Sequence, residues 1–382
     1  MKIADYVESQ IKGLWGTDFD ENGIPVIKTN NLTYEGFIDY SDICKRNIPM
    51  EQAKQWYLKH GDLLIEKSGG TKTHSVGYVS YFEGENNKFV CNNFILALRL
   101  KNTINSKFLF YQIQFKYDSN QFADCFNKTT GIQNLKIKDY LDKEIKVYAP
   151  EKQAKIVKEL DIIRNLINKN KEILSKYDIL IKSRFIEMFG DPHDNKTYPY
   201  KTVGEFTTVT SGGTPDRKNN EYWKNGTIPW VKTTELQNNE LTEIEEYITQ
   251  KGLDESSAKI VPAGTLLIAM YGQGKTRGMT AYLGIEASTN QACACILPSE
   301  NINQKYLWYY FILSYDKLRD LAKGGNQPNL NGNMIKSFQV LWPPIEKQDE
   351  YVQFVQQIDK SKFKIWLYIN LCVIIERRVF CV

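Results

Sequence analysis

Residues 150–189 read PEKQAKIVKELDIIRNLINKNKEILSKYDILIKSRFIEMF, a stretch without glycine. Apolar side chains recur in it at alternating spacings of four and three residues. A period near 3.5 predicts a coiled-coil helix with one partner helix. Pro150 and Glu151 form a start signal and Gly190-Asp191-Pro192 a stop signal, and the helix between them would be about 58 Å long. The predicted spacer stripe consists of Ile156, Leu160, Ile163, Ile167, Leu174, Tyr177, Ile181 and Met188.

Two questions about this stretch stay open at the level of sequence. A long helix packed on an ordinary core is the alternative to a coiled coil, although it would tolerate a wider apolar stripe. Asn170, which falls within the stripe, could set the register of a helix pair or could be solvated at a local gap.

The composition is that of a globular chain. With 382 residues, of which 42% are hydrophobic and 25% charged, the chain is long enough for two cores. A formal net charge of +4 permits a nucleic-acid partner without requiring one. The seven cysteines are odd in number and include no Cys-x-x-Cys pair, which predicts a reducing compartment and therefore the cytoplasm. We expect no signal peptide after Met1 and no membrane association, because the apolar run at 365–375 is too short to cross a bilayer.

Segments of the first half of the chain return in the second half in the same order, which indicates an internal repeat. The offset between matching segments drifts from 204 residues (24 to 228) to 195 residues (151 to 346), as loops of unequal length would cause. The clearest matches are Ile24-Pro25-Val26-Ile27-Lys28-Thr29 with Ile228-Pro229-Trp230-Val231-Lys232-Thr233, Gly61-Asp62-Leu63-Leu64-Ile65 with Gly264-Thr265-Leu266-Leu267-Ile268, and Glu151-Lys152-Gln153 with Glu346-Lys347-Gln348.

Each copy of the repeat is predicted to hold a globular domain, here called a head, followed by a long helix. We place head 1 at 1–148, the first spacer helix at 149–190, head 2 at 197–342 and the second spacer helix at 343–382. The economical way for both helices to bury their stripes is an antiparallel coiled coil, which relates the two copies by a pseudo-two-fold axis. Apolar runs at 63–65, 94–98, 265–270 and 292–297 predict strands, and 107–118 and 305–321 look helical. The predicted fold class is therefore α+β, with a twisted, curled sheet in each head.

We predict no catalytic and no metal-binding residues. The loop Gly272-Gln273-Gly274-Lys275-Thr276 lacks the first glycine of a phosphate-binding loop, because Ala269 stands at that position. The three histidines are scattered without carboxylates or cysteines at metal-ligand spacing.

The loops instead combine cations, amide and hydroxyl groups and glycine. Residues 271–278 form a glycine-rich loop after a predicted strand, and 66–73 are its counterpart in head 1. Such side chains contact phosphates and read base edges, although each loop taken singly also fits an ordinary polar loop. Trp223 and Trp230 are predicted to be packed rather than stacked on bases. The predicted DNA-binding residues are Lys28, Thr29, Lys67, Lys72, Thr73, Arg217, Lys218, Lys232, Thr233, Gln273, Lys275 and Arg277.

With the repeat and these loops in view, residues 1 to about 363 resemble the specificity subunits of type I restriction-modification systems. The segments that carry the resemblance in head 2 are Ser211-Gly212-Gly213-Thr214-Pro215, Glu221-Tyr222-Trp223, Ile228-Pro229-Trp230-Val231-Lys232, Gly274-Lys275, Thr289-Asn290-Gln291 and Gln327-Pro328-Asn329-Leu330, followed by Pro343-Pro344-Ile345-Glu346-Lys347-Gln348.

The resemblance implies a non-catalytic, DNA-reading subunit. Each head would be a target recognition domain that reads one half of a bipartite, gapped site in double-stranded DNA. The expected partners are two modification subunits, which methylate adenine with S-adenosylmethionine, and restriction subunits that translocate DNA with ATP and Mg²⁺. No cofactor is expected on this chain. Because one turn of DNA spans about 34 to 36 Å, the length of the spacer helices would set the gap between half-sites.

Two segments depart from the family pattern. Leu14-Trp15-Gly16 stands in head 1 where a Ser-Gly-Gly-like loop is expected, so the target of head 1 should differ from that of head 2. After Phe363 the sequence is apolar on every side of a helix, and the second spacer helix is therefore expected to be atypical or shortened. The alternative functions are a tandem protein- or carbohydrate-recognition module on a coiled coil, and a single-chain nuclease or methylase.

Overall fold

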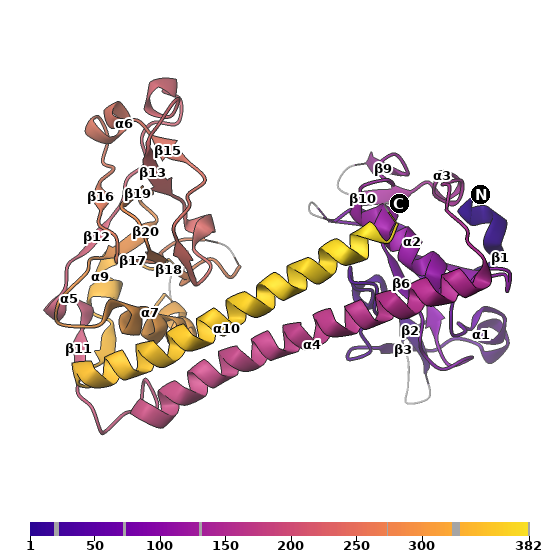
Figure 1. The fold of residues 1–382 in the computed structure, drawn as a ribbon, viewed down its shortest axis with the longest axis horizontal. Coiled ribbons are helices and arrows are strands. Elements are labelled where there is room, and N and C mark those ends of the chain that lie inside the picture. Colours follow the sequence, from indigo (N-terminus) through magenta and orange to yellow (C-terminus); the bar gives the residue numbers. More distant parts are fainter. Residues whose placement is uncertain (19–22, 72–73, 130–131, 273, 323–328, 381–382) are drawn as a thin grey trace. The chain divides into compact units, whose positions relative to one another are not determined.

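The computed structural model describes residues 1–18, 23–71, 74–129, 132–272, 274–322 and 329–380 (Figure 1). The chain divides into two compact units. Unit 1 comprises Met1–Asn170 and Leu367–Val382, and unit 2 comprises Lys171–Trp366. Unit 1 therefore contains head 1 and unit 2 contains head 2, each with part of both long helices.

The two long helices are α4, Pro150–Phe189, and α10, Ile345–Arg378. The helix predicted at 150–189 is confirmed, and the apolar run at 365–375 continues α10 as helix. In unit 1, Arg164 Nε lies 2.7 Å from Glu376 Oε1. In unit 2, Lys362 Nζ lies 2.7 Å from Asp178 Oδ1. Also in unit 2, Arg184 NH2 lies 3.1 Å from Glu350 Oε1. The later residue of α4 there meets the earlier residue of α10, so the predicted antiparallel pairing of the helices is confirmed in unit 2.

The remaining elements of unit 1 build head 1. A four-stranded sheet has the order β1-β8-β4-β6, and three-stranded sheets have the orders β3-β2-β7 and β5-β10-β9. The bounds are β1 Val7–Ile11, β2 Ile24–Ile27, β3 Cys44–Arg46, α1 Met50–Trp56, β4 Leu63–Glu66, β5 Ser68–Gly69, β6 Val79–Tyr81, β7 Val90–Cys91, β8 Ile95–Leu100, α2 Ser106–Asp118, β9 Phe126–Thr129, β10 Ile132–Leu135 and α3 Ile137–Leu141, with short 3-10 turns η1 Ile3–Tyr6 and η2 Thr29–Asn31.

Unit 2 repeats this plan in head 2. Its sheets have the orders β12-β20-β17-β18-β14, β15-β13-β19-β16 and β11-β21. The bounds are β11 Tyr200–Thr202, α5 Val203–Phe206, β12 Val209–Ser211, η3 Asn220–Tyr222, β13 Ile228–Val231, η4 Thr233–Glu235, β14 Asn239–Leu241, β15 Tyr247–Ile248, α6 Gln250–Asp254, β16 Ile260–Val261, β17 Leu266–Ala269, β18 Thr280–Leu283, β19 Ala287–Thr289, β20 Cys293–Ile296, α7 Gln304–Leu313, α8 Tyr315–Asp320, α9 Gly332–Lys336 and β21 Gln339–Leu341.

The central strand of each head is buried on both faces, because its side chains alternate between two clusters. In β4, Leu63 and Ile65 join the core that contains α2, whereas Leu64 joins a second core that contains Ile27 of β2. In β17, Leu266 and Ile268 face the core of α7, and Leu267 packs in a separate core on the other face. Each head is thus layered as helix, central sheet and second sheet. This arrangement confirms the α+β fold class.

A buried glutamine joins each head to a long helix in the same way. Gln153 Oε1 accepts from the Asn105 N–H at 2.9 Å, and Gln348 Oε1 accepts from the Asn303 N–H at 2.9 Å. Asn105 and Asn303 cap the N-termini of α2 and α7. Since backbone groups that are buried need partners, these bonds fix the start of the head helix on the long helix. The internal repeat is therefore present in hydrogen bonding as well as in sequence.

One predicted helix is interrupted. Residues 305–321 were expected to form a single helix, but α7 ends at Leu313 and α8 begins at Tyr315. Ser314, between them, is fully buried, and its hydroxyl donates to the Tyr310 carbonyl at 2.7 Å. A serine that bonds to the backbone competes with helical hydrogen bonding, which accounts for the break.

Candidate nucleic-acid interface

In each head, the connection after β2 or β13 is hydrogen-bonded to the start of the strand that follows the glycine-rich loop, which is β6 in head 1 and β18 in head 2. In head 1 the connection after β2 approaches the glycine-rich loop after β4, and the Tyr78 hydroxyl donates to the Thr29 carbonyl at 3.5 Å. In head 2 the connection after β13 is joined to the start of β18. The Asn238 N–H donates to the Thr280 carbonyl at 2.8 Å, and Asn238 Oδ1 accepts from the Thr280 N–H at 3.1 Å. The repeat therefore joins equivalent connections and strands in both heads.

A cluster of charges and indole rings lies at the start of head 2. The Arg217 guanidinium stacks over the Trp223 ring at 3.8 Å and lies 4.6 Å from the centre of the Trp230 ring. Its NH1 atom lies 2.5 Å from Glu246 Oε2. Trp230 is 2% exposed and donates its indole N–H to the Gly213 carbonyl at 2.9 Å, which agrees with its predicted packing.

Glu246 also holds a second predicted DNA-binding cation. Lys232 Nζ lies 2.9 Å from Glu246 Oε1 and 2.9 Å from Glu245 Oε2. Hydrogen bonds from Glu246 and then Glu245 raise the pKa of Lys232. Burial alone would raise the pKa of Glu246, but Lys232 and Arg217 outweigh it and lower that pKa. Arg217 and Lys232 thus share one carboxylate.

The glycine-rich loop of head 2 is fastened to α8. The Tyr315 hydroxyl donates to the Lys275 carbonyl at 2.7 Å, and Arg319 NH1 donates to the Arg277 carbonyl at 2.7 Å. The Lys275 side chain is exposed, and so is that of Lys218 in the β12–η3 connection. Thr233 begins η4 and is partly buried, whereas Gln273 lies outside the described residues.

The predicted DNA-binding residues of head 1 lie in less charged surroundings than those of head 2. Lys28 Nζ lies 3.4 Å from Asp42 Oδ2, and Thr29 begins the turn η2. Lys67, partly buried, lies between β4 and β5. Lys72 and Thr73 lie outside the part of the chain that the structure describes.

A cavity of about 600 Å³ opens between the two loops of head 1. Thr29 and Leu32 line it from the connection after β2, and Glu66 and Ser68 from the glycine-rich loop. Phe94 and Ile132, both more than half exposed, stand at its margin. Glu66 is 7% exposed, and burial raises its pKa while the Gly70 N–H partly offsets that effect. The cavity thus offers one acidic acceptor among neutral and apolar groups.

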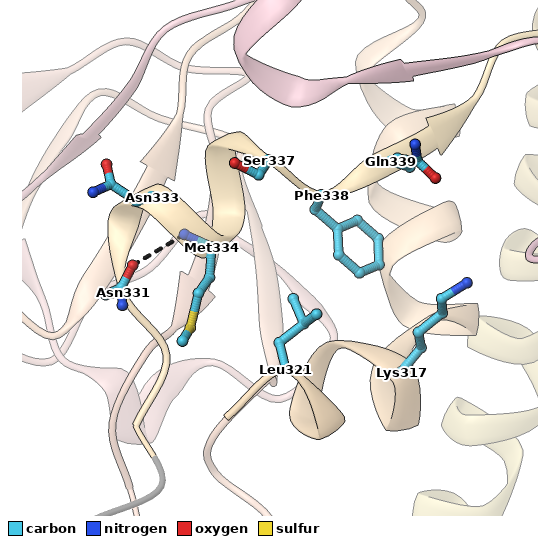
Figure 2. Close-up of a pocket in the computed structure, with 8 residues that line it drawn as sticks. All are labelled: Lys317, Leu321, Asn331, Asn333, Met334, Ser337, Phe338 and Gln339. Atoms are coloured by element: carbon cyan, nitrogen blue, oxygen red, sulfur yellow. Dashed lines mark hydrogen bonds between the residues drawn. The ribbon is translucent and has the colours of Figure 1, made fainter. Parts of the chain in front are cut away.

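A second cavity, of about 560 Å³, lies in head 2 beside α8 and α9 (Figure 2). Its wall includes Leu321 and Phe338, and Asn331 Oδ1 accepts from the Met334 N–H at 3.0 Å at the start of α9. The side chain of Lys317 is the cation that lines it. None of the predicted DNA-binding residues that the structure describes lines this cavity, so we do not assign it to the interface.

The predicted spacer residues differ in their surroundings. Ile156 and Leu160 are buried in the core of head 1, and Ile181 and Met188 pack against the core of head 2. Ile167 is buried, and Ile163, Leu174 and Tyr177 are partly buried. Asn170 Nδ2 donates to the Leu166 carbonyl of its own helix at 2.7 Å, a contact that sets no register.

Sequence reasoning missed several residues that organise these regions. Phe185 and Phe189, which the predicted stripe does not include, are buried in the core of head 2. Glu246 was missed because its partner Arg217 is 29 residues distant in sequence. Glu66 begins the glycine-rich loop 66–73, but the prediction of phosphate-binding residues there considers cations, because phosphates are anionic. Comparison of the two copies of the repeat would identify Glu66, since Ala269 stands at the equivalent position in β17.

Within the described ranges, no group of three or more histidine, cysteine or acidic side chains is placed to hold a metal ion. Likewise, none of the helices in those ranges has the length and hydropathy required to span a bilayer.

Comparison with known proteins identifies the family. The model of the type I restriction modification DNA specificity domain matches this chain twice, at residues 5–190 and 195–366. The chain belongs to this family. Each match takes in one head and the long helix that follows or accompanies it, so the repeat is a duplication of the specificity domain.

Two curated members of the specificity-domain family are similar to part of the chain. The type I restriction enzyme EcoR124I/EcoR124II specificity subunit of Escherichia coli is 31% identical over 164 residues, which cover 42% of this chain and 40% of that protein. The MjaIX specificity subunit of Methanocaldococcus jannaschii is 30% identical over 172 residues, which cover 43% and 38%. The matched region thus spans about two fifths of the length of these relatives.

Solved structures share the fold over the whole chain. A chain from a study of complex assembly and conformational transition of the type I R-M system covers 100% of this chain and 95% of its own length, with a TM-score of 0.57 and 14% identity. The S subunit of a type I restriction-modification system from M. genitalium covers 100% and 94%, with a TM-score of 0.54 and 14% identity. At this identity the likeness concerns the fold alone.

Proposed function

We propose that this chain is the specificity subunit of a type I restriction-modification complex, and that each head reads one half of a bipartite, gapped site in double-stranded DNA. The single observation that carries the proposal is the double match to the DNA specificity domain, one for each head. Two unlike readers on one chain suit a site made of two unlike halves.

The loop chemistry of the heads supports the same proposal. Arg217 and Lys232 bring two cations to one place in head 2, and guanidinium and ammonium groups are the main phosphate contacts in protein–DNA complexes. The cavity of head 1 offers hydroxyl groups, backbone groups and a carboxylate, which suit base edges.

We further propose that the chain is not itself an enzyme and that it directs catalytic partners. Two modification subunits would bind S-adenosylmethionine and methylate adenine, and restriction subunits would use ATP and Mg²⁺. The free cysteines of the described part of the chain fit a reducing compartment, and we place the complex in the cytoplasm with its DNA.

The long helices carry a surface that suits such a partner. Phe363 and Trp366 of α10 are exposed, and their rings stack with centroids 6.0 Å apart. Ile179 of α4 is also exposed. Exposed apolar side chains of this size mark protein interaction sites, and a modification subunit is the partner we propose for them.

Sequencing of adenine methylation in cells with and without this chain tests the function. We expect a bipartite, gapped methylation motif that depends on the chain. An identical methylome in both cells, together with no salt-dependent duplex binding in the presence of modification subunits, would instead favour recognition of protein or carbohydrate.

A further inference from the structure

The described part of head 1 contains two buried carboxylates, Asp62 and Glu66, at opposite ends of β4, and their surroundings differ. Asp62 is 2% exposed and fully engaged: Arg99 Nε donates to Oδ1 at 3.0 Å, Arg99 NH2 donates to Oδ2 at 2.8 Å, and the Lys59 N–H donates to Oδ2 at 2.7 Å. Glu66, at 7% exposed, accepts from the Gly70 N–H at 3.4 Å, the upper limit of hydrogen-bond distance. Asp62 therefore has a structural role, whereas Glu66 retains capacity to accept.

The position of Glu66 gives it access to a ligand. It is the last residue of β4, and it lines the cavity formed with the connection after β2. The neighbouring Gly69 has a φ of +133°, and a Cβ there would lie 2.6 Å from Glu66 Oε1. Glycine at 69 thus leaves room for the carboxylate at the cavity wall.

The repeat makes Glu66 specific to head 1. The equivalent residue in head 2 is Ala269, which is buried in an apolar core with Leu267 and Val231. The glycine is shared by both heads, since Gly272 has a φ of +143° where Gly69 has +133°. The backbone of the two loops is therefore alike at this point, while the chemistry differs by one carboxylate.

We propose that Glu66 is a specificity-determining residue of head 1, which accepts a hydrogen bond from the exocyclic amine of adenine or cytosine in the major groove. The inference rests on the proposed function. An ionised carboxylate only accepts, so it pairs with the amines of adenine N6 and cytosine N4. The carbonyl oxygens of guanine and thymine would face it as a second acceptor, and burial would make that contact more costly.

The test compares the methylation motif of cells that carry the full chain with its modification partners. In Glu66→Gln, the side chain keeps its size but can donate as well as accept. We expect one position of the head 1 half-site to lose its restriction to adenine or cytosine, with methylation at guanine or thymine variants rising on the order of tenfold. The half-site of head 2 should not change. Glu85→Gln, an exposed glutamate of head 1 paired with Lys88, is the matched control and should keep the parental motif.

A folded Glu66→Gln variant with the parental motif would overturn the inference and leave the proposed function intact. Absence of any chain-dependent motif in the parental cells would instead remove the proposed function itself. If Glu66→Gln fails to fold, as judged by thermal unfolding of the purified complex, Glu66→Asp replaces it. That variant keeps the charge but withdraws the acceptor, so methylation should fall several-fold with the same base preference, and unchanged methylation would overturn the inference.

Discussion

Glu246→Gln should strengthen the binding of head 2 to DNA of any sequence. Glu246 pairs with both Arg217 and Lys232, so it occupies the cations that the proposed function assigns to phosphates. A DNA phosphate has to displace the Glu246 carboxylate before it can contact Arg217 or Lys232. The neutral glutamine removes that competition and leaves the side-chain volume unchanged.

The size of the effect follows from the exposure of the pairs. The side chains of Arg217, Lys232 and Glu246 are 48%, 25% and 31% exposed, so solvent screens both pairs. Partly exposed pairs contribute about 0.2–1 kcal/mol each. Losing two of them would raise the affinity for DNA by about twofold to thirtyfold. Lys232 keeps its contact with Glu245, which favours the lower part of this range.

The dependence on salt provides an independent magnitude. Each additional phosphate that a cation neutralises changes the slope of log affinity against log salt concentration by about 0.9. Two released cations should therefore steepen the slope by up to about 1.8. Fluorescence anisotropy of the full chain with a short duplex of arbitrary sequence, over a series of salt concentrations, measures both quantities.

Glu221→Gln is the matched control for Glu246→Gln. It makes the same change of charge in head 2, but its partner is Lys251, which is not a predicted DNA-binding residue. We expect a smaller gain in affinity and little change in slope. If Glu246→Gln binds DNA more weakly than the parent, or if the two variants behave alike, Arg217 and Lys232 do not bind phosphates in the way we infer.

Three further predictions concern stability and spacing. Gln348→Ala leaves the Asn303 N–H and the Pro343 carbonyl without their buried partner. It should lower the free energy of unfolding of unit 2 by about 2–4 kcal/mol in urea titrations, whereas Gln356→Ala, at an exposed position, should not. An equal loss in both variants would show that the Gln348 hydrogen bonds do not stabilise unit 2. Burial lowers the pKa of His193 from 6.5 to about 4. The free energy of unfolding of unit 2 should therefore fall by about 1–2 kcal/mol as the pH is lowered from 6.5 to 4, and His193→Gln should abolish this loss. The same pH profile in the variant and the parent would contradict this prediction. Four residues inserted after Ser175 lengthen α4 by about 6 Å and should change the tolerated gap between half-sites by about two base pairs, and an unaltered gap in the methylation motif would count against a spacer function.

Local patterns in the sequence predicted the elements well. The 3.5-residue period and the terminal proline and glycine located α4 to within one residue at each end, because helix periodicity and capping depend on near neighbours. Short apolar runs preceded by glycine likewise located β4 and β17 to within one residue at each end. The break at Ser314 was not predictable in this way, since it depends on the burial of one serine against a helix turn.

The candidate interface was predicted only in part, because its key contacts are not local. Loop composition located Arg217 and Lys232, but the carboxylate that joins them comes from a connection beyond the next strand. Burial was also not evident from the sequence. Asp62 and Glu66 flank the same apolar run, and their difference appears only once Arg99 is placed beside Asp62. Charge in a sequence identifies candidates, whereas packing decides which charges are available to a ligand.

The duplication separates what the fold requires from what each head reads. Gln153 and Gln348 make the same bonds to the caps of α2 and α7, and Gly69 and Gly272 share a backbone conformation that other residues rarely adopt. These positions serve the scaffold, so they had reason to stay alike in both copies. Glu66 and Ala269 lie at equivalent places on that scaffold and differ in charge and hydrogen bonding. A difference that leaves the frame unaltered is the change expected where two copies of one domain came to recognise different ligands, and it is the reason to seek specificity at the end of the central strand.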